Sequence, residues 1–216
     1  MEKRLSPAYK FSSAMEEYAP RFNIQLSAQA IARLREYYEQ VMAWNKRLHL
    51  VAPCSPAEFA TRHVLESLLA VDYMYEGASV ADVGSGAGLP IIPCLIVRSD
   101  INATLFESSK KKAIFLREAL SRPDLSERAE VIAERFEKMP APQADFITCR
   151  ALERLTEMFK TLVNWSPTTS TLLIFGGEAL RKEMEKYSLN IQAIRIPESE
   201  RRFLFIAKRL DSIASK

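Results

Sequence analysis

Apolar side chains recur at steps of three or four residues through the segment that follows Ser27. This spacing predicts an amphipathic helix, which Ser27 can cap at its first turn. Pro53 comes after the predicted end of this helix. The apolar stripe is formed by Ile31, Leu34, Tyr38, Val41, Trp44 and Leu48.

A second helix is predicted to begin at Ser55. Serine at the N-cap, Pro56 in the first turn and Glu58 three residues after the serine form a capping-box pattern. The apolar positions that follow are Phe59, Val64, Leu68, Leu69 and Val71. Residues 1–76 are therefore expected to form a helical N-terminal extension.

The pattern changes at Ser79, where short apolar runs begin to alternate with helical stretches. The first run, Ser79–Val83, leads into a glycine-rich turn and then a helix that ends near Val97. Helices are also predicted at 109–120 and 152–163. Alternation of this kind is typical of a parallel sheet covered on both faces. The further strands are predicted at 103–107, 129–133, 145–149, 171–175, 191–196 and 203–208.

Connections between strands shorten toward the C-terminus, which favours a final antiparallel hairpin. The expected fold of residues 77–216 is therefore α/β, a doubly wound, seven-stranded, mostly parallel sheet. The helical extension is expected to pack against it.

Composition narrows the class of protein. The chain has 216 residues, 48% of them hydrophobic and 26% charged, as in ordinary globular proteins. Three widely spaced cysteines and two histidines argue against a disulfide framework or a zinc site and favour a reducing compartment. The longest apolar run, residues 89–97, is too short to span a bilayer. We expect a cytoplasmic monomer that binds no metal and no membrane.

The glycine-rich turn is the most informative stretch for chemistry. It reads Gly-x-Gly-x-Gly from Gly84 to Gly88 and follows the acidic Asp82. Dinucleotide-binding turns have the spacing Gly-x-Gly-x-x-Gly and hold a pyrophosphate, which a neighbouring carboxylate would repel. A carboxylate suits the ammonium group of S-adenosylmethionine, which carries no phosphate. The turn therefore favours this cofactor, with expected contacts from Asp82, Gly84, Ser85, Gly86 and Gly88.

Glu107 ends the second predicted strand, where a carboxylate can accept hydrogen bonds from both ribose hydroxyls. A nicotinamide cofactor would use the same position, so Glu107 does not distinguish the two cofactors. A glycine turn that binds no ligand is a third interpretation.

Several segments together resemble one family, the small-subunit (16S) ribosomal RNA guanine-N7 methyltransferases, called RsmG or GidB. The glycine turn with the Leu89–Pro90 extension is one of these segments, and the matches run from about residue 27 to residue 208. The other matching segments are Trp44-Asn45-Lys46, residues 62–67 (Arg-His-Val-Leu-Glu-Ser), Phe115-Leu116-Arg117, Arg135-Phe136-Glu137, Cys149-Arg150-Ala151 and Glu200-Arg201-Arg202.

The resemblance implies a class I methyltransferase fold, S-adenosylmethionine as cofactor, and a guanine of small-subunit rRNA, free or in the 30S particle, as substrate. It adds Leu89, Phe136, Glu137 and Arg150 to the expected cofactor contacts and assigns the ribose to Glu107. Polar or cationic positions that would face the RNA are Asn45, Arg62, Lys111, Arg135 and Arg201. The chain departs from the family pattern at Gly176, where the family has a lysine.

Guanine N7 has a free lone pair and no proton, so its methylation needs no general base. Catalysis should then depend on positioning and electrostatics. Arginine can address the adjacent O6 and N7 acceptors of guanine. Arg150 or Arg135 is expected to act catalytically by orienting the guanine or its phosphate, the alternative for each being an ion pair without a role in catalysis.

The sequence is also compatible with three other functions. A nucleophilic Cys149 would instead direct the methyl group to C5 of cytosine. The chain could also methylate a small molecule or a protein. The remaining alternative is an oxidoreductase or a binding module that uses a dinucleotide.

Overall fold

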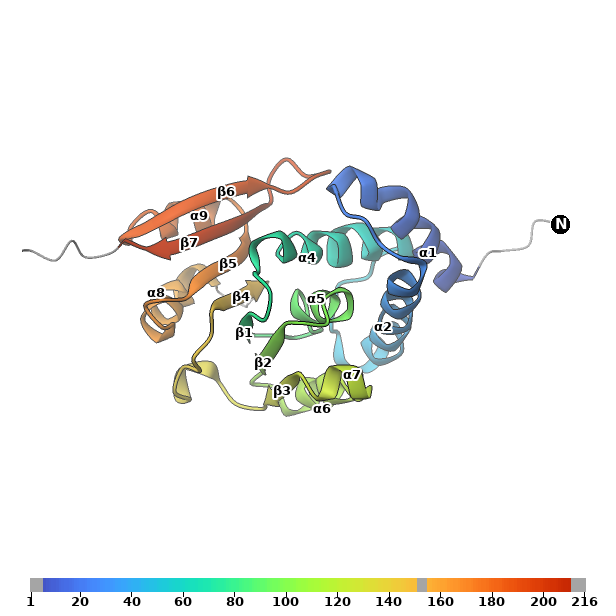
Figure 1. The fold of residues 1–216 in the computed structure, drawn as a ribbon, viewed down its shortest axis with the longest axis horizontal. Coiled ribbons are helices and arrows are strands. Elements are labelled where there is room, and N and C mark those ends of the chain that lie inside the picture. The colour runs from blue at the N-terminus through green and yellow to red at the C-terminus, as the bar shows by residue number, and fades with distance from the viewer. Residues whose placement is uncertain (1–5, 151–154, 211–216) are drawn as a thin grey trace, which may run out of the picture.

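A seven-stranded sheet forms the centre of the molecule in the computed structural model, which describes residues 6–150 and 155–210 (Figure 1). The strand order is β3-β2-β1-β4-β5-β7-β6. Strands β1 to β5 pair in parallel, whereas β7 is antiparallel to both β5 and β6. The predicted doubly wound sheet and its final hairpin are confirmed. The strands are β1 (Ser79–Val83), β2 (Asn102–Phe106), β3 (Ala129–Ile132), β4 (Phe146–Arg150), β5 (Thr171–Gly176), β6 (Leu189–Arg195) and β7 (Phe203–Arg209).

The order of the strands reverses beside β1. The chain goes from β1 outward to β2 and β3 and then returns to β4 on the other side of β1. Val83 at the end of β1 lies opposite Cys149 near the end of β4. Open α/β sheets bind ligands at such a switch point, outside the carboxyl ends of the strands. The glycine turn after β1 lies at this edge.

The two predicted helix starts in the N-terminal part, at Ser27 and Ser55, are confirmed. Ser27 Oγ accepts a hydrogen bond from the amide of Ala30, and Ser55 and Glu58 form both bonds of a capping box. The helical segments of this part are α1 (Pro7–Tyr18), η1 (Ala19–Phe22), α2 (Ala28–Leu48), α3 (Pro56–Glu58), η2 (Phe59–Leu65), α4 (Glu66–Leu68) and η3 (Val71–Tyr73).

The remaining helical segments lie between the strands. The predicted start of one helix at Leu152, like Ala151 of the family motif, lies outside the described residues. The segments are α5 (Ile91–Val97), α6 (Lys110–Ala119), α7 (Pro123–Ser126), η4 (Phe136–Lys138), α8 (Leu155–Trp165) and α9 (Glu178–Met184).

One helical rod contains a feature that the apolar pattern did not predict. Segments α3, η2 and α4 follow each other directly, and η2 is a seven-residue π-helix. Its last bond runs from the amide of Glu66 to the carbonyl of Thr61. A π-helical stretch shifts backbone bonding by one residue, so its return to α-helix frees a carbonyl for another donor.

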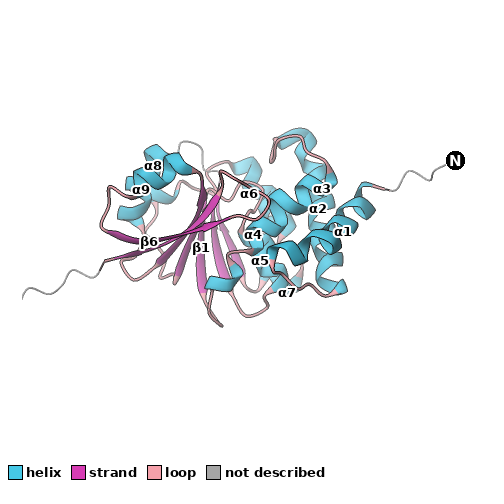
Figure 2. Ribbon diagram, turned by 90° about the horizontal axis from the view of Figure 1, so that it is seen from above, coloured by secondary structure: helices cyan, strands magenta, loops and turns pink. Residues whose placement is uncertain are grey.

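Helices cover both faces of the sheet (Figure 2). The N-terminal helices share one apolar core with β1, β2 and α5, in which Leu34 and Phe59 belong to the same cluster as Val80 and Leu95. The predicted division at residues 76 and 77 therefore marks a change from helices to sheet, while the core continues across it.

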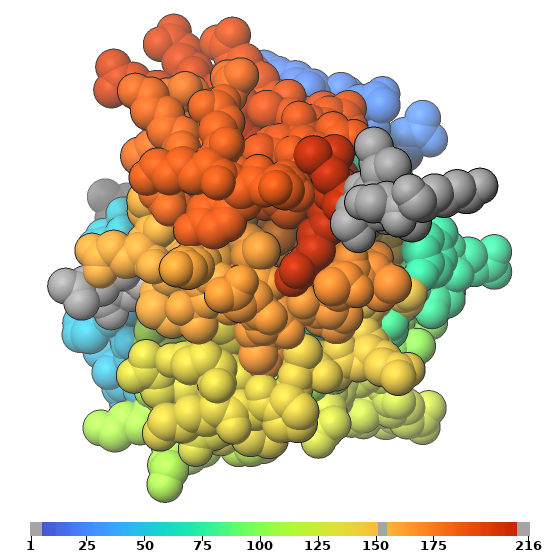
Figure 3. Space-filling view, turned by 90° about the vertical axis from the view of Figure 1, so that its left-hand side faces the viewer, coloured from blue at the N-terminus to red at the C-terminus, as the bar shows by residue number. Residues whose placement is uncertain are grey.

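Helices α8 and α9 cover the opposite face, where Phe159 and Leu180 pack on Ile147 and Ile174. Figure 3 shows this side of the molecule, with residues around η4 in yellow next to α8. Among residues 6–150 and 155–210, no helix combines the length and apolarity needed to cross a membrane.

Candidate functional site

The glycine turn is held in a fixed shape by the end of β2. The amides of Gly84 and Ser85 both donate to the carbonyl of Phe106, at 2.9 and 3.1 Å. Gly84 and Gly88 have φ angles of 69° and 83°, which favour glycine. A Cβ at Gly88 would also lie 2.3 Å from Ile92 Cδ1. The turn therefore requires glycine for both conformation and space.

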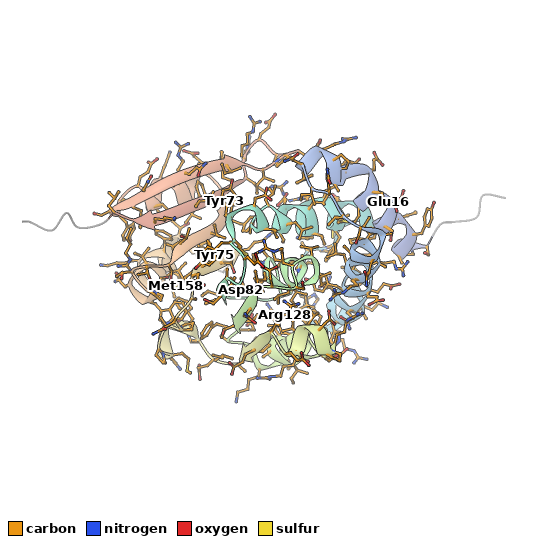
Figure 4. The ribbon with its side chains drawn as sticks, in the orientation of Figure 1. Glu16, Tyr73, Tyr75, Asp82, Arg128 and Met158 are labelled. Carbon is orange, nitrogen blue, oxygen red and sulfur yellow. The ribbon has the colours of Figure 1, made fainter. Side chains whose placement is uncertain are left out.

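Asp82 lies at the centre of the molecule, directly before this turn (Figure 4). The side chain is fully buried, and its Oδ1 accepts a 2.6 Å hydrogen bond from Thr148 Oγ1. Its Oδ2 has no hydrogen-bond partner within the described part of the chain. Burial raises the pKa of Asp82 to about 7. A buried carboxylate with an open oxygen is a strong acceptor for a cation or a hydrogen-bond donor.

Glu107 connects the end of β2 to the glycine turn. Its Oε2 accepts a hydrogen bond from the amide of Gly86 at 2.8 Å, and its Oε1 accepts one from the amide of Ser109 at 2.7 Å. Each carboxylate oxygen can accept a second bond, so the side chain can still bind hydroxyl groups. The geometry fits the role expected for Glu107.

The segment after β3 brings apolar and charged groups to the same edge. Phe136 is buried and packs edge-on against Trp165, with ring centroids 5.2 Å apart. Arg135 and Glu137 pair with each other at 2.6 Å, and the Arg135 side chain is 56% exposed. Arg135 therefore lies at the surface, where an RNA could reach it.

Two members of the expected cofactor set are turned inward. Ser85 is buried and its Oγ donates to the carbonyl of Asp82 at 3.2 Å, so this side chain stabilises the turn. Leu89 is 7% exposed and belongs to the core.

Tyr37 of α2 supports the glycine turn, a role that the sequence did not reveal. Its hydroxyl donates a 2.7 Å hydrogen bond to the carbonyl of Ala87. Burial raises the pKa of the Tyr37 hydroxyl, so it remains a donor at neutral pH. The helical spacing identifies Tyr37 only as an apolar neighbour, since nothing local indicates the carbonyl 50 residues away.

Arg150 at the end of β4 is bound inside the protein. Its Nη1 donates to the carbonyl of His63 and to Ser67 Oγ, at 3.2 and 3.1 Å. Its Nη2 donates to the carbonyl of Arg62 and pairs with Glu66 Oε2 at 3.1 Å. These four acceptors match the four Nη hydrogens, and the side chain is only 12% exposed. In this structure the Nη donors of Arg150 face the η2–α4 rod. Its expected roles in orienting the guanine and in binding the cofactor stay predictions.

The same cluster includes Arg202, which pairs with Glu66 Oε1 at 2.8 Å. The Glu66 side chain is 2% exposed and lies between the two arginines. Burial raises the pKa of Glu66, and Arg150 and Arg202 oppose that rise. Burial, together with the nearby arginines, lowers the pKa of His63 to about 4, so this imidazole is neutral at pH 7.

Besides Arg135, the residues expected to contact RNA fall into two groups. Asn45 is used locally, because its side-chain amide bonds both the carbonyl and the amide of Val51, at 3.1 and 2.9 Å. In this structure its side chain closes a loop, and its expected contact with RNA stays a prediction. Arg62, Lys111 and Arg201 are exposed, which leaves them available to phosphates.

Cys149 does not support attack on a cytosine. The residue is fully buried in the apolar cluster beneath α8, between Val83 and Ile174 on the neighbouring strands. Burial in apolar surroundings disfavours the thiolate that nucleophilic attack requires. Within the described ranges, no group of three or more His, Cys, Asp or Glu side chains is arranged to hold a metal ion.

Comparisons with known proteins agree with this geometry. The family model for rRNA small subunit methyltransferase G matches residues 30–206. A protein of that name from Xanthomonas campestris pv. campestris is 35% identical over 85% of this chain and 89% of its own length. A namesake from Xanthomonas axonopodis pv. citri is 44% identical, and that match spans 60% of this chain and 61% of the relative.

Solved structures support the fold. An S-adenosylmethionine-dependent methyltransferase from Aquifex aeolicus superposes with a TM-score of 0.55 at 16% identity, over 69% of this chain and 92% of the other. The expected methyltransferase fold and the expected family are thus both confirmed. The chain belongs to the family of rRNA small subunit methyltransferase G.

Proposed function

We propose that this chain transfers the methyl group of S-adenosylmethionine to N7 of a guanine in small-subunit rRNA. The observation that carries the proposal is the open Oδ2 of the buried Asp82 beside the glycine turn. This oxygen suits an ammonium group, whereas the pyrophosphate of a dinucleotide would be repelled by it. Membership of the rRNA methyltransferase family supports the choice of substrate.

The residues of the site fit this cofactor. Asp82 would accept hydrogen bonds from the ammonium group, and Glu107 would accept them from the ribose hydroxyls. Phe136 and Leu89 are largely buried apolar residues that we assign to the adenine side of the site, and Glu137 follows Phe136 in the chain. When bound, the cofactor supplies a methyl group on a sulfonium, which is electrophilic. Gly84, Gly86 and Gly88 allow the backbone to approach it closely.

Guanine N7 needs no deprotonation, so the protein only has to position the base and neutralise phosphates. Arg135, Arg62, Lys111 and Arg201 are the cations that we assign to RNA contact, since their side chains are exposed. Arg150 holds the end of β4 to the η2–α4 rod and remains, with Arg135, a candidate for orienting the guanine. We further propose that the chain acts as a cytoplasmic monomer on rRNA or on the 30S particle.

The test uses cofactor labelled in its methyl group. The chain is incubated with 30S particles or with free small-subunit rRNA from cells that lack the gene, and the RNA is digested to nucleosides. We expect the label in 7-methylguanosine. Label in 5-methylcytidine, or its absence from both substrates, would contradict the proposal. A thermal-shift comparison of S-adenosylhomocysteine with NAD serves as control, because only the true ligand raises Tm.

A further inference from the structure

Glu66 joins three parts of the chain that are distant in sequence. It belongs to the η2–α4 rod, pairs with Arg150 at the end of β4, and pairs with Arg202 before β7. Arg150 in turn bonds the carbonyls of Arg62 and His63 in the same rod. One carboxylate thus connects the N-terminal extension, the sheet and the C-terminal hairpin.

The turn between β6 and β7 lies at the carboxyl edge of the parallel strands. Strand β7 runs antiparallel to β5, so Phe203 at its start pairs with Gly176 at the end of β5. A Cβ at Gly177 would lie 3.2 Å from the carbonyl oxygen of Arg201. Residues 196–202 are therefore brought to the edge that carries the glycine turn.

The charges around Glu66 separate into internal and external groups. Arg150 is nearly buried and Arg202 is 31% exposed, and both pair with the carboxylate. Arg62 directly precedes His63 in the chain, Arg201 directly precedes Arg202, and both Arg62 and Arg201 are exposed. The position of the two exposed arginines therefore depends on backbone segments that the buried cluster holds.

We propose that Glu66 is a positioning residue for the RNA substrate. Through Arg150 and Arg202 it fixes the rod and the β6–β7 turn relative to each other, so that Arg62 and Arg201 face one RNA backbone at a set spacing. The inference rests on the proposed function, and it assigns Glu66 no contact with RNA or cofactor.

The test compares Glu66→Gln with Glu198→Gln in the full chain. Glu198 lies in the same turn and pairs with Arg21 of η1 at 3.4 Å, but both side chains are 49% exposed. For Glu66→Gln we expect KM for rRNA to rise at least tenfold. We expect kcat and the Kd for S-adenosylhomocysteine to stay within threefold. Glu198→Gln should leave all three within twofold of the wild type.

Two further variants separate positioning from general damage. Glu66→Asp keeps the charge and should recover part of the lost KM. Arg202→Gln leaves the Glu66–Arg150 pair in place and should raise KM alone, even if Glu66→Gln does not fold. Unchanged KM in both Glu66→Gln and Arg202→Gln, or a loss of cofactor affinity that parallels the rise in KM, would overturn the inference.

Hydrogen exchange gives a readout that is independent of methyl transfer. The amide of Ile196 donates to the carbonyl of Arg202 at 3.0 Å, at the base of the turn. We expect exchange of residues 196–203 to accelerate at least tenfold in Glu66→Gln and in Arg202→Gln, and not in Glu198→Gln. Unchanged exchange of residues 196–203 in Glu66→Gln and Arg202→Gln would show that Glu66 does not hold the β6–β7 turn. If the wild type methylates no rRNA, the proposed function and the RNA role fail together, whatever the exchange shows.

Discussion

Asp82 and Glu66 are both buried carboxylates near the carboxyl edge of the sheet, yet their surroundings are opposite. Asp82 Oδ1 accepts a hydrogen bond from Thr148, whereas Oδ2 has no hydrogen-bond partner among the described residues. No cation pairs with Asp82 in this part of the chain. Glu66 is held between Arg150 and Arg202. Burial raises the pKa of both carboxyls, but only Glu66 has paired arginines that oppose the rise.

This difference shows how similar burial can serve two purposes. An open buried carboxylate is costly, and a cationic ligand that binds there removes part of the cost. A carboxylate that is already neutralised has little to offer a ligand and serves to fix backbone segments. This contrast supports the proposals that the glycine turn binds the ligand and that the cluster around Glu66 positions backbone segments.

Breaking the cluster around Glu66 should cause the largest loss in the free energy of unfolding. Arg150→Ala leaves a buried carboxylate with one partner and uncovers the carbonyls of Arg62 and His63. We expect the free energy of unfolding to fall by about 3–5 kcal/mol, as for other broken buried pairs. Urea denaturation measures this. The matched control is Arg135→Ala, whose exposed pair with Glu137 is worth at most about 1 kcal/mol. Equal losses in the two variants would contradict the distinction.

The second prediction concerns the pH dependence that Asp82 brings. Its folded-state pKa of about 7 exceeds the ordinary value of 3.8, so folding favours the protonated carboxyl. The resulting stability is complete below about pH 4 and is lost as pH rises through 7. Relative to Asp82→Asn, the wild type without ligand should lose roughly 2–3 kcal/mol between pH 5 and pH 8. Parallel stability curves for the two proteins would show that Asp82 does not titrate in this range.

Two glycine-to-alanine variants should show a smaller difference in stability, which separates the cost of a steric clash from the cost of a positive φ. Gly77 and Gly88 have similar φ angles of 77° and 83°. A Cβ at Gly77 meets nothing within 4 Å, whereas one at Gly88 collides with Ile92. Both alanine variants share the cost of the positive φ, so Gly88→Ala should be less stable than Gly77→Ala by about 1–2 kcal/mol. It should also weaken cofactor binding. Thermal unfolding compares them, and equal Tm values would refute the steric argument.

Local patterns in the sequence were sufficient to predict most of the strands and helices and the glycine turn. The strand β1 with its glycine turn, the cap at Ser27 and the capping box at Ser55 all depend on residues within a few positions of each other. Their physical causes are local, so the sequence displays them directly. The position of Asp82 and Glu107 beside the glycine turn could be predicted because strand ends in a parallel sheet meet at one edge. Their contacts with the cofactor stay predictions.

The role of Arg150 could not be predicted in the same way. Its acceptors lie 83 to 88 residues earlier in the chain, and two are carbonyls in a π-helical stretch that no apolar pattern indicates. The position of Arg150 at the end of β4 predicts that it faces the cleft. In the structure its side chain points toward the η2–α4 rod instead. The local bonds of Asn45 to Val51 could not be predicted for a related reason, since side-chain type alone does not distinguish a loop-closing amide from one that faces RNA.

The number of protons released when the cofactor site is filled shows most directly whether Asp82 pairs with the ammonium group of the cofactor. Calorimetric titration with S-adenosylhomocysteine at pH 6, in two buffers of different ionisation enthalpy, measures this number. If the ammonium group pairs with Asp82, the carboxyl must ionise, and close to one proton should leave the wild type and none should leave Asp82→Asn. Equal proton release from the two proteins would contradict the assignment of the open carboxylate as the cofactor's partner.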